Sequence, residues 1–393
     1  MQVASTVRRV FRVLRPPVTL HSIQFLYPDA RATEPPHNSP RQWWNYSTFS
    51  SQTHLFAVNN WQHRGQCSMY VMTPRATFVT SVEESPTEAV KELYDKMLQS
   101  VNARTMPPNA WLWSLIEKCA NNEDIKLLFD ILHNLRRFRL SNLRIHANFN
   151  FNLCREVTKA CARIGALDFG KKALWKHNVY GLTPSIGSAH HLLLYAKKHN
   201  DAKLMVEIMK LLKRNDLPLQ AGTADIVFSI CYHTDNWQLI SKYSKKFVKA
   251  GVKLRQTTFD TWMEFAAKIG DIETLWKIEK LRSDSMKQHS IATGISCAKG
   301  FLLEHKPGNA AAMIEALNQN LTDAKRPGLM VELQNLVSEW PLEVIKRQKE
   351  ENRKALAAAL QTDIPAMVSC LLSTGLEVSA SMEDLTKEGG VLC

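Results

Sequence analysis

The middle of this chain of 393 residues repeats one short turn: Ile164-Gly165-Ala166, His199-Asn200-Asp201, Thr234-Asp235-Asn236 and Ile269-Gly270-Asp271. Each copy starts 35 residues after the previous one, at 164, 199, 234 and 269. A second marker keeps the same step, at Gly181-Leu182, Asp216-Leu217 and Gly251-Val252. A fixed period between about 20 and 50 residues indicates a solenoid, in which each unit buries its apolar face only against its neighbours. The markers predict four units, at 151–185, 186–220, 221–255 and 256–290.

Each unit is expected to form a helix, a three-residue turn, a second helix and a link that contains Gly or Pro. In the fourth unit, Phe259, Trp262 and Phe265 follow helical spacing on the first helix, and Leu275 and Ile278 do so on the second. No segment sustains the alternation of apolar and polar residues that is typical of a strand, so no strand is predicted. The expected fold class is therefore all-α, built as a helix-turn-helix repeat solenoid.

Residues 85–150 are expected to form N-terminal helices and a degenerate first repeat. Ser85 fits an N-cap, Pro86 the first helical position, and Glu88 completes a capping box. A second helical pair is expected at about 109–120 and 124–138, followed by a longer connection around 139–148.

The C-terminal residues 291–378 are expected to form helical repeats or a cap, without a clean 35-residue step. The expected helices are 292–304, 309–320, 328–340 and a single charged helix 342–360. Residues 379–393 are expected to be a frayed tail. No run approaches the ~18 apolar residues of a membrane-spanning helix, since the nearest, 364–376, contains Pro365.

The N-terminal 82 residues differ in composition from the rest, with eight arginines, no lysine and only two acidic residues. An Arg-rich, Ser-rich, acid-poor amphipathic start is typical of an organellar transit peptide. We expect residues 1–40 to be a mitochondrial transit peptide, with a plastid as the less favoured destination and a retained basic arm as the alternative. Residues 41–84 are then a disordered or partly ordered basic segment, and the mature protein is expected in the mitochondrial matrix.

The excess that gives the net charge of +13 lies in the N-terminal segment and in the first three repeats. Residues 141–260 carry 19 basic and 8 acidic residues, whereas residues 261–393 carry 15 and 18. A basic block on a folded array suggests a polyanion, with nucleic acid the leading candidate. The alternative is a solvated charged face that binds no RNA.

The residues of the fourth unit resemble a known family. Thr257-Thr258-Phe259-Asp260-Thr261-Trp262 and the following Phe265–Asp271 are similar to the first-helix consensus of pentatricopeptide repeat (PPR) proteins, and Gly181–Ser185 and Lys249–Lys253 resemble that family's link between repeats. The resemblance covers about 140 residues well and roughly 150 more as continued helical pairing. It implies a right-handed superhelical array, an organellar location and single-stranded RNA as the usual ligand. The tetratricopeptide family has a period of about 34 and a signature that this chain lacks.

In that family the fifth and last residues of a repeat read one base. The corresponding pairs here are Arg155 with Ser185, His190 with Gln220, Asp225 with Arg255, and Asp260 with Ser290. The family usually has Asn, Thr or Ser fifth and Asp, Asn or Ser last, and none of the four pairs matches both halves. The one-base-per-repeat code is therefore not expected to operate in this array.

Many basic residues fall in the predicted second helices, which lie outside the groove in this family. The candidate contacts to RNA phosphates are Lys171, Lys172, Lys176, Lys203, Lys210, Lys213, Arg214, Lys242, Lys245, Lys246 and Lys249. Such a surface suits a large folded RNA, bound by charge and shape without base reading. Basic residues of the first helices, such as Arg155, Lys159 and Arg163, keep groove binding open.

The sequence matches no known catalytic or metal-binding pattern in full, so no catalytic residue, metal, cofactor or small-molecule substrate is expected. The stretch 165–172 resembles a phosphate-binding loop but lacks the Ser or Thr after its lysine. His190-His191 with Cys231 and His233 matches no zinc spacing. The eight cysteines show no close pairing, which indicates reduced and mostly buried thiols.

These observations lead to three hypotheses for the function, all of them non-catalytic. The leading one is an RNA- or ribonucleoprotein-binding scaffold, as a component or assembly factor of the mitochondrial ribosome, with ribosomal RNA and ribosomal proteins as partners. The second is a factor that binds one mitochondrial messenger RNA for processing, stability or translation. The third is a protein adaptor.

Overall fold

The computed structural model describes residues 85–140 and 143–376, with only the backbone described for Leu140 and for residues 143–147. The expected transit peptide at 1–40, the segment 41–84 and the tail 379–393 lie outside these residues. Over the described ranges the chain forms α-helices and one 3-10 turn, and no strand, which confirms the all-α class.

In chain order the elements are α1 (Glu88–Asn102), α2 (Asn109–Lys118), α3 (Asn122–Leu140), α4 (Leu143–Ile164), α5 (Leu167–Ala173), α6 (Ile186–Lys198), α7 (Ala202–Arg214), α8 (Ala221–His233), α9 (Trp237–Lys249), α10 (Gln256–Ile269), α11 (Ile272–Ser285), α12 (Ile291–Leu303), α13 (Pro307–Asn320), η1 (Asp323–Lys325), α14 (Arg326–Ser338), α15 (Trp340–Arg347) and α16 (Glu350–Ser373).

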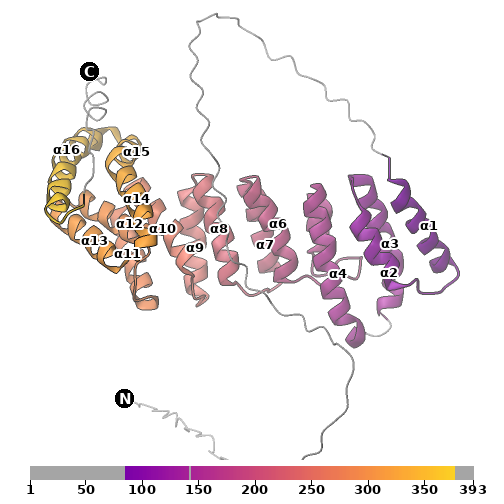
Figure 1. Cartoon of the computed structure of the whole chain (residues 1–393). Helices are drawn as coiled ribbons and strands as arrows, with labels where there is room; N and C mark the ends of the chain where they lie inside the picture. The colour runs from indigo at the N-terminus through magenta and orange to yellow at the C-terminus, as the bar shows by residue number, and fades with distance from the viewer. Residues whose placement is uncertain (1–84, 141–142, 377–393) are drawn as a thin grey trace, which may run out of the picture. The chain divides into compact units, whose positions relative to one another are not determined.

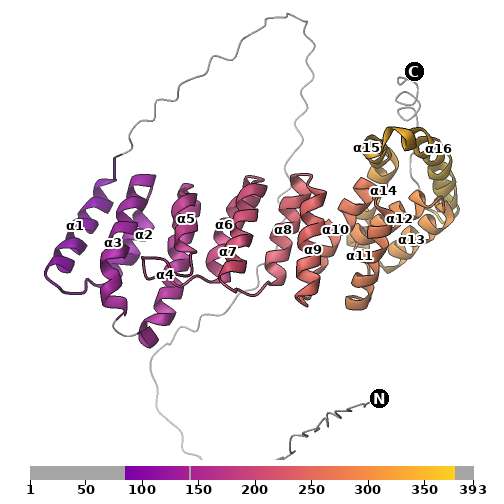
Figure 2. The ribbon, with the colours of Figure 1, turned by 180° about the vertical axis from the view of Figure 1, so that it is seen from behind.

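From α5 to α13 the helices alternate in two series that keep one step. The first helices α6, α8, α10 and α12 begin at 186, 221, 256 and 291, and the second helices α5, α7, α9, α11 and α13 begin at 167, 202, 237, 272 and 307. Each first helix from α4 to α12 packs on the next one, and each second helix packs on the first helix of its own pair. Figures 1 and 2 show successive pairs side by side.

The recurring turn exists because its middle residue adopts the left-handed backbone conformation. Gly165, Asn200, Asp235, Gly270 and His305 have φ of +89°, +50°, +52°, +80° and +58°. The following amide closes the first helix, as Asp201 N does on the Ala196 carbonyl oxygen at 2.8 Å, and this left-handed closure is a common helix end. His305 occupies the same place one step beyond Ser290. The expectation that the 35-residue step ends at Ser290 is therefore wrong, because α12 and α13 retain it.

The same turn also starts the second helix through a side-chain cap. The carboxylate or amide oxygens of Asp201, Asn236 and Asp271 accept hydrogen bonds from the backbone amides three residues later, at 2.9, 3.0 and 3.0 Å. A side chain of this kind satisfies one of the amides that a helix start leaves without a partner. The sequence marker thus combines a helix stop with a helix start.

The predicted start of the first helix is wrong. Thr87 is the N-cap of α1, and no capping box forms at Ser85. Instead, the Thr87 amide and hydroxyl donate to the buried carboxylate of Asp124, at 2.8 and 3.1 Å. A contact between helix starts 37 residues apart cannot be recognised from local spacing, and it joins α1 to α3.

Two other boundaries also differ from the expectation. The longer connection around 139–148 does not exist, because α3 continues to Leu140 and α4 begins at Leu143. Most of the residues expected in that connection instead belong to the end of α3 and the start of α4. The single helix 342–360 is two helices, α15 and α16, which separate at Gln348. The side-chain nitrogen of Gln348 donates to the Ile269 carbonyl at 2.9 Å, and this bond holds the break between α15 and α16 against the end of α10.

Helix α15 returns to the array and docks on α10. The Trp340 indole donates to the Ala267 carbonyl at 3.0 Å, and Glu343 pairs with Lys268 at 3.0 Å. Arg347 pairs with Asp235 of the third recurring turn at 2.8 Å. The C-terminal helices therefore occupy part of the surface of α8 and α10 that would otherwise be open.

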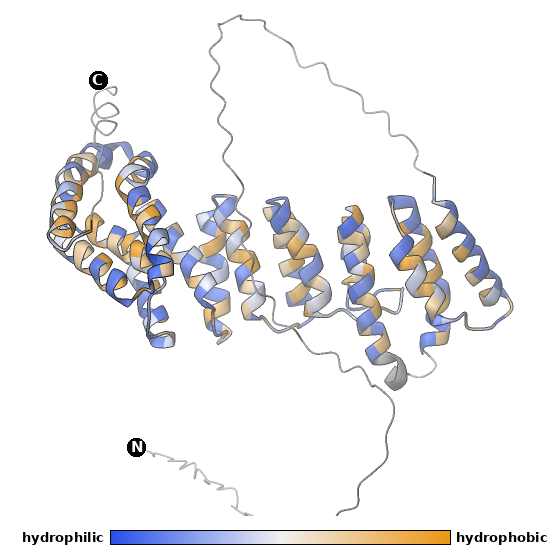
Figure 3. Ribbon diagram, in the orientation of Figure 1, coloured by the Kyte–Doolittle hydropathy of each residue, from blue (hydrophilic) through white to orange (hydrophobic). Residues whose placement is uncertain are grey.

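The core is divided along the chain. Three clusters of buried side chains follow one another, within residues 90–182, 174–297 and 295–376. Figure 3 shows hydrophobic residues along one side of many helices and hydrophilic residues along another. In the described part of the chain six cysteines are free, and all but Cys370 are buried, which confirms the prediction for those thiols.

One helix in the described residues, α16, is long and apolar enough to cross a membrane. Its residues Leu360, Ile364, Met367 and Leu371 are buried and belong to the C-terminal core cluster. Helix α16 packs against α12, α13 and α15. Within the described residues α16 is thus a single, weak candidate, which is consistent with the expectation of no membrane span.

The docking of α15 leads to a prediction about three glycines with positive φ. Alanine at Gly165 or Gly251 is expected to cost about 1 kcal/mol of folding stability, because the left-handed conformation is unfavourable for a residue with a Cβ. Alanine at Gly270 is expected to cost about 2–3 kcal/mol, because its Cβ would also displace Gln348 Nε2 from its bond to the Ile269 carbonyl and lie 3.1 Å from Val344 Cγ2. Urea unfolding of the three variants measures the difference. Equal losses would mean that α15 does not pack on this turn in solution.

Candidate nucleic-acid interface

The basic candidates lie on consecutive second helices. Lys171 and Lys172 are on α5, and Lys176 follows it in the link. Lys203, Lys210, Lys213 and Arg214 are on α7, and Lys242, Lys245, Lys246 and Lys249 are on α9. All are exposed except Lys171, which is half-buried. One correction concerns Lys176, which was expected within a second helix, but α5 ends at Ala173.

Most of these cations have no counter-charge within the described part of the chain. Lys171 Nζ pairs with Asp168 and Glu207, both at 2.9 Å, and Lys176 pairs with Asp216 at 3.1 Å. The other nine have no described carboxylate within 4.0 Å: Lys172, Lys203, Lys210, Lys213, Arg214, Lys242, Lys245, Lys246 and Lys249. Burial together with the neighbouring charges of Lys242 and Lys213 lowers the pKa of Lys246. The like charges of α7 and α9 thus oppose one another, and an anion would relieve that repulsion.

Two grooves lie between neighbouring second helices. The α5/α7 groove, of about 450 Å³, is lined by Lys171, Lys172, Trp175, Lys210 and Arg214 together with Asp168, Glu207 and Leu211. The α9/α11 groove, of about 480 Å³, is lined by Lys245, Val248, Lys249, Trp262 and Lys277 together with Ser241, Ser244, Thr274, Ile278 and Leu281. The two grooves occupy corresponding places two steps apart in the array. Both combine apolar walls with basic residues.

The structure brings together two of the four candidate base-reading pairs. The Arg255 guanidinium donates to Asp225 at 3.2 Å, and the Ser290 hydroxyl donates to Asp260 at 2.6 Å. Asp225 also accepts from the hydroxyls of Thr257 and Thr258, and Asp260 accepts from Gln256. The carboxylates at these positions are therefore engaged within the protein.

The other two pairs are not joined. The Ser185 hydroxyl caps α6 through a capping box with Ser188, while Arg155 pairs with Glu156 at 3.3 Å. His190 Nε2 bonds the Thr223 hydroxyl at 2.8 Å, and Gln220 is exposed. Burial, followed by the charge of His191, lowers the pKa of His190, so its ring is neutral near pH 7. All four fifth-position side chains thus bond or pair with a residue other than the last residue of their own repeat.

Arg163, one of the basic residues that could serve the groove, has a structural role. Its Nη2 donates to the carbonyls of Ile116, Glu117 and Cys119, at 3.2, 3.0 and 2.9 Å. These carbonyls lie at the end of α2, where a helix leaves acceptors without partners. Arg163 therefore stabilises the contact between α2 and α4.

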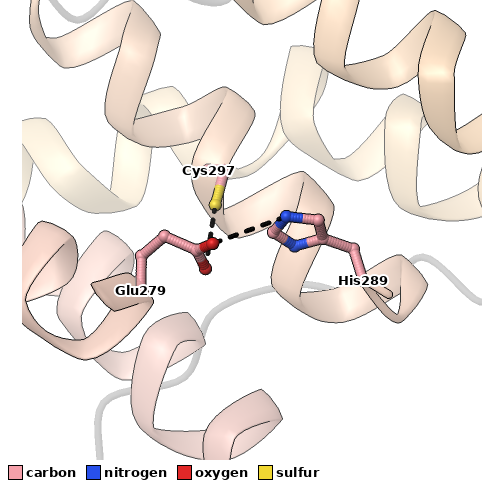
Figure 4. Close-up of side chains that lie close together, drawn as sticks. All are labelled: Glu279, His289 and Cys297. Carbon is pink, nitrogen blue, oxygen red and sulfur yellow. Dashed lines mark hydrogen bonds and ion pairs between the residues drawn. The ribbon is translucent and has the colours of Figure 1, made fainter. Parts of the chain in front are cut away.

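Sequence reasoning missed one cluster that combines residue types found in metal sites: Glu279, His289 and Cys297 (Figure 4). The Glu279 carboxylate lies 3.5 Å from His289 Nε2 and 3.7 Å from Cys297 Sγ. Both carboxylate oxygens already accept from the Arg282 guanidinium, at 2.8 and 2.7 Å. Burial raises the pKa of the Cys297 thiol and lowers that of His289. A protonated thiol and a guanidinium on the carboxylate disfavour a cation, so the cluster is a partly buried ion-pair network.

The link after α11 differs from the Gly- or Pro-containing link expected after each second helix, and the ion-pair network holds it instead. The links after the earlier second helices contain Gly181, Asp216 and Gly251, each with positive φ. The corresponding residue after α11 is Met286, which is extended, with φ of −140°. Arg282 Nη1 donates to the carbonyls of Met286 and Gln288 at 3.2 and 3.1 Å and so holds this link. The sequence signal for this difference was Met286, which stands where the earlier links have Gly or Asp.

Comparison with known proteins adds no assignment to this geometry: no family model matches the chain, and no curated protein matches it either.

Proposed function

We propose that the protein is a PPR-like solenoid that binds RNA without catalysis, as a component or assembly factor of the mitochondrial ribosome. The helix starts at 186, 221, 256 and 291 support the repeat assignment. The proposal depends above all on one observation: exposed cations on α7 and α9 have no carboxylate within 4.0 Å in the described part of the chain. Lysine and arginine side chains in this state are available to RNA phosphates.

The positions that would read bases support a scaffold over a sequence reader. A base edge that binds an aspartate needs a free carboxylate oxygen, and the carboxylates of Asp225 and Asp260 already accept hydrogen bonds from neighbouring side chains. Trp340 of α15 and Gln348, which follows α15, also bond to the carbonyls of Ala267 and Ile269 at the end of α10. Charge and shape recognition of a folded RNA needs neither of these positions.

A transcript-specific factor is the second candidate. The observation that favours it is the exposed indole of Trp175 in the α5/α7 groove. An aromatic ring can stack on an unpaired base, which a single strand presents and a folded ribosomal RNA mostly does not.

Ultraviolet crosslinking followed by sequencing of RNA bound to the tagged protein in isolated mitochondria tests the proposal. Sedimentation of the same extract at low and high salt accompanies it. We expect crosslinks to ribosomal RNA and co-migration with a ribosomal subunit. Slow sedimentation with one enriched transcript would replace the leading function by the second candidate. An absence of RNA crosslinks would favour a protein adaptor and overturn both.

A further inference from the structure

We propose that Trp175 is a stacking platform for a base of single-stranded RNA, in the α5/α7 groove, with Lys172, Lys210 and Arg214 binding the adjacent phosphates. This site rests on the RNA binding that both candidate functions share, and narrows its ligand to an unpaired segment of RNA. It is formed by α5, the link after α5 and α7, away from the fifth and last positions of the repeats.

The indole of Trp175 is exposed although its backbone is fixed. Half of the residue is accessible, at 50%, whereas Trp262 and Trp340 are 6% and 4% exposed. The Trp175 carbonyl accepts from both the backbone and the side-chain nitrogen of Asn178, at 3.2 and 2.8 Å. Asn178 is itself buried, and its side-chain amide donates to the Leu182 carbonyl and accepts from the Leu182 backbone amide. The ring is therefore presented by an ordered turn.

The charges around this ring suit a phosphate backbone. Asp168 and Glu207, the acidic residues of the groove, are both bound by Lys171 at 2.9 Å. No described carboxylate lies within 4.0 Å of Lys172, Lys210 or Arg214. The Lys172 ammonium lies 4.9 Å from the Phe169 ring centre, which leaves its other donors for an anion. The groove thus combines one flat apolar surface with three cations that have no described carboxylate within 4.0 Å.

The position of Trp175 in the repeat places it at the head of a row. Residues at the same register in the following second helices are Lys210, Lys245 and Lys280, all exposed. Lys245 also lines the corresponding α9/α11 groove. A strand anchored by one stacked base at Trp175 would meet successive cations along this row. Stacking platforms combined with a basic track are the usual means of binding single strands without sequence preference.

The ligand class follows from the geometry of stacking. A base can lie flat on an indole only when one of its faces is free, which requires a single strand, a loop or an end. We therefore expect single-stranded RNA to bind more tightly than a duplex of the same sequence. Trp175→Ala should weaken binding of the single strand about 5- to 150-fold, and Trp175→Phe should restore most of the affinity.

The test uses the full chain and a labelled 20-nucleotide RNA of mixed sequence, single-stranded or annealed, with fluorescence anisotropy as the readout. Leu194→Ala is the matched control, because Leu194 is also 50% exposed but belongs to the first helix α6. It should leave the affinity unchanged. Thermal unfolding of each variant shows that the fold is retained, and mass spectrometry of ultraviolet crosslinks should identify Trp175.

The outcomes separate the site from the function. Salt-dependent RNA binding that Trp175→Ala does not alter would overturn the stacking site and leave the proposed function standing. No RNA binding by the unmodified chain, in either form, would overturn both. Unchanged RNA affinity with loss of a co-purifying mitochondrial protein would assign Trp175 to a protein contact instead.

Discussion

Replacing Arg282 by Met is expected to lower the free energy of unfolding by about 3–5 kcal/mol. The Arg282 side chain is 3% exposed and that of Glu279 19%, so the variant leaves a carboxylate largely buried without its partner. It also removes the donors to the Met286 and Gln288 carbonyls, which hold the link from α11 to α12. Urea unfolding followed by circular dichroism measures the loss.

A charge pair on the same helix is the matched control. Lys277 and Glu273 are also paired, at 2.5 Å, but their side chains are 68% and 82% exposed. Lys277→Met should therefore cost no more than about 0.5 kcal/mol. The double variant Arg282→Met with Glu279→Leu should recover part of the loss, because no unpaired charge is left in the interior. A double variant as unstable as Arg282→Met alone would show that the bonds to the two carbonyls, and not the ion pair, determine the stability.

The repeating helices could be predicted from the sequence because their determinants are local. A turn such as Thr234-Asp235-Asn236 encodes both a left-handed residue and an N-cap within three positions. The ends of the second helices carry a second local signal at Gly181, Asp216 and Gly251. Propensity and hydrogen-bond chemistry act over these few residues, so spacing alone places the helices.

The parts that could not be predicted depend on contacts between distant residues. Asp124 determines the start of α1 from 37 residues away, and Ala267 accepts from Trp340, which is 73 residues away. The first prevented recognition of Thr87 as the N-cap. The second, with the bond from the Gln348 side chain to the Ile269 carbonyl, holds α15 against α10 and separates it from α16.

The sequence predicts that basic residues cluster on the second helices, but it does not predict which of them are free of carboxylate partners. The clustering of Lys203, Lys210, Lys242 and Lys245 on second helices follows from the period. Which lysines lack a carboxylate partner does not, because Lys171 meets Glu207 only when two repeats are packed together. The engagement of Asp225 by Arg255 likewise depends on residues 30 positions apart.

Neutralising the basic face of α9 is expected to produce the largest effect on RNA binding. The variant changes Lys242, Lys245, Lys246 and Lys249 to Gln. If each lysine contacts one phosphate, the slope of log K against log salt should become shallower by about 3. Affinity for RNA at low salt should fall about 10- to 100-fold. Filter binding of a mitochondrial ribosomal RNA fragment at several salt concentrations measures both quantities.

A second variant separates this interface from a general effect of charge. Lys96, Lys126, Lys306 and Arg326 are paired with Glu92, Glu123, Glu304 and Asp323. Changing these four to Gln removes the same formal charge but frees four carboxylates away from α9. A long-range attraction would weaken equally in both variants, because it depends on net charge alone. Contacts between α9 and phosphates would instead be lost only in the first. If α9 contacts RNA phosphates directly, the slope should become shallower only in the α9 variant. Identical slopes in both variants would exclude direct contacts between α9 and phosphates.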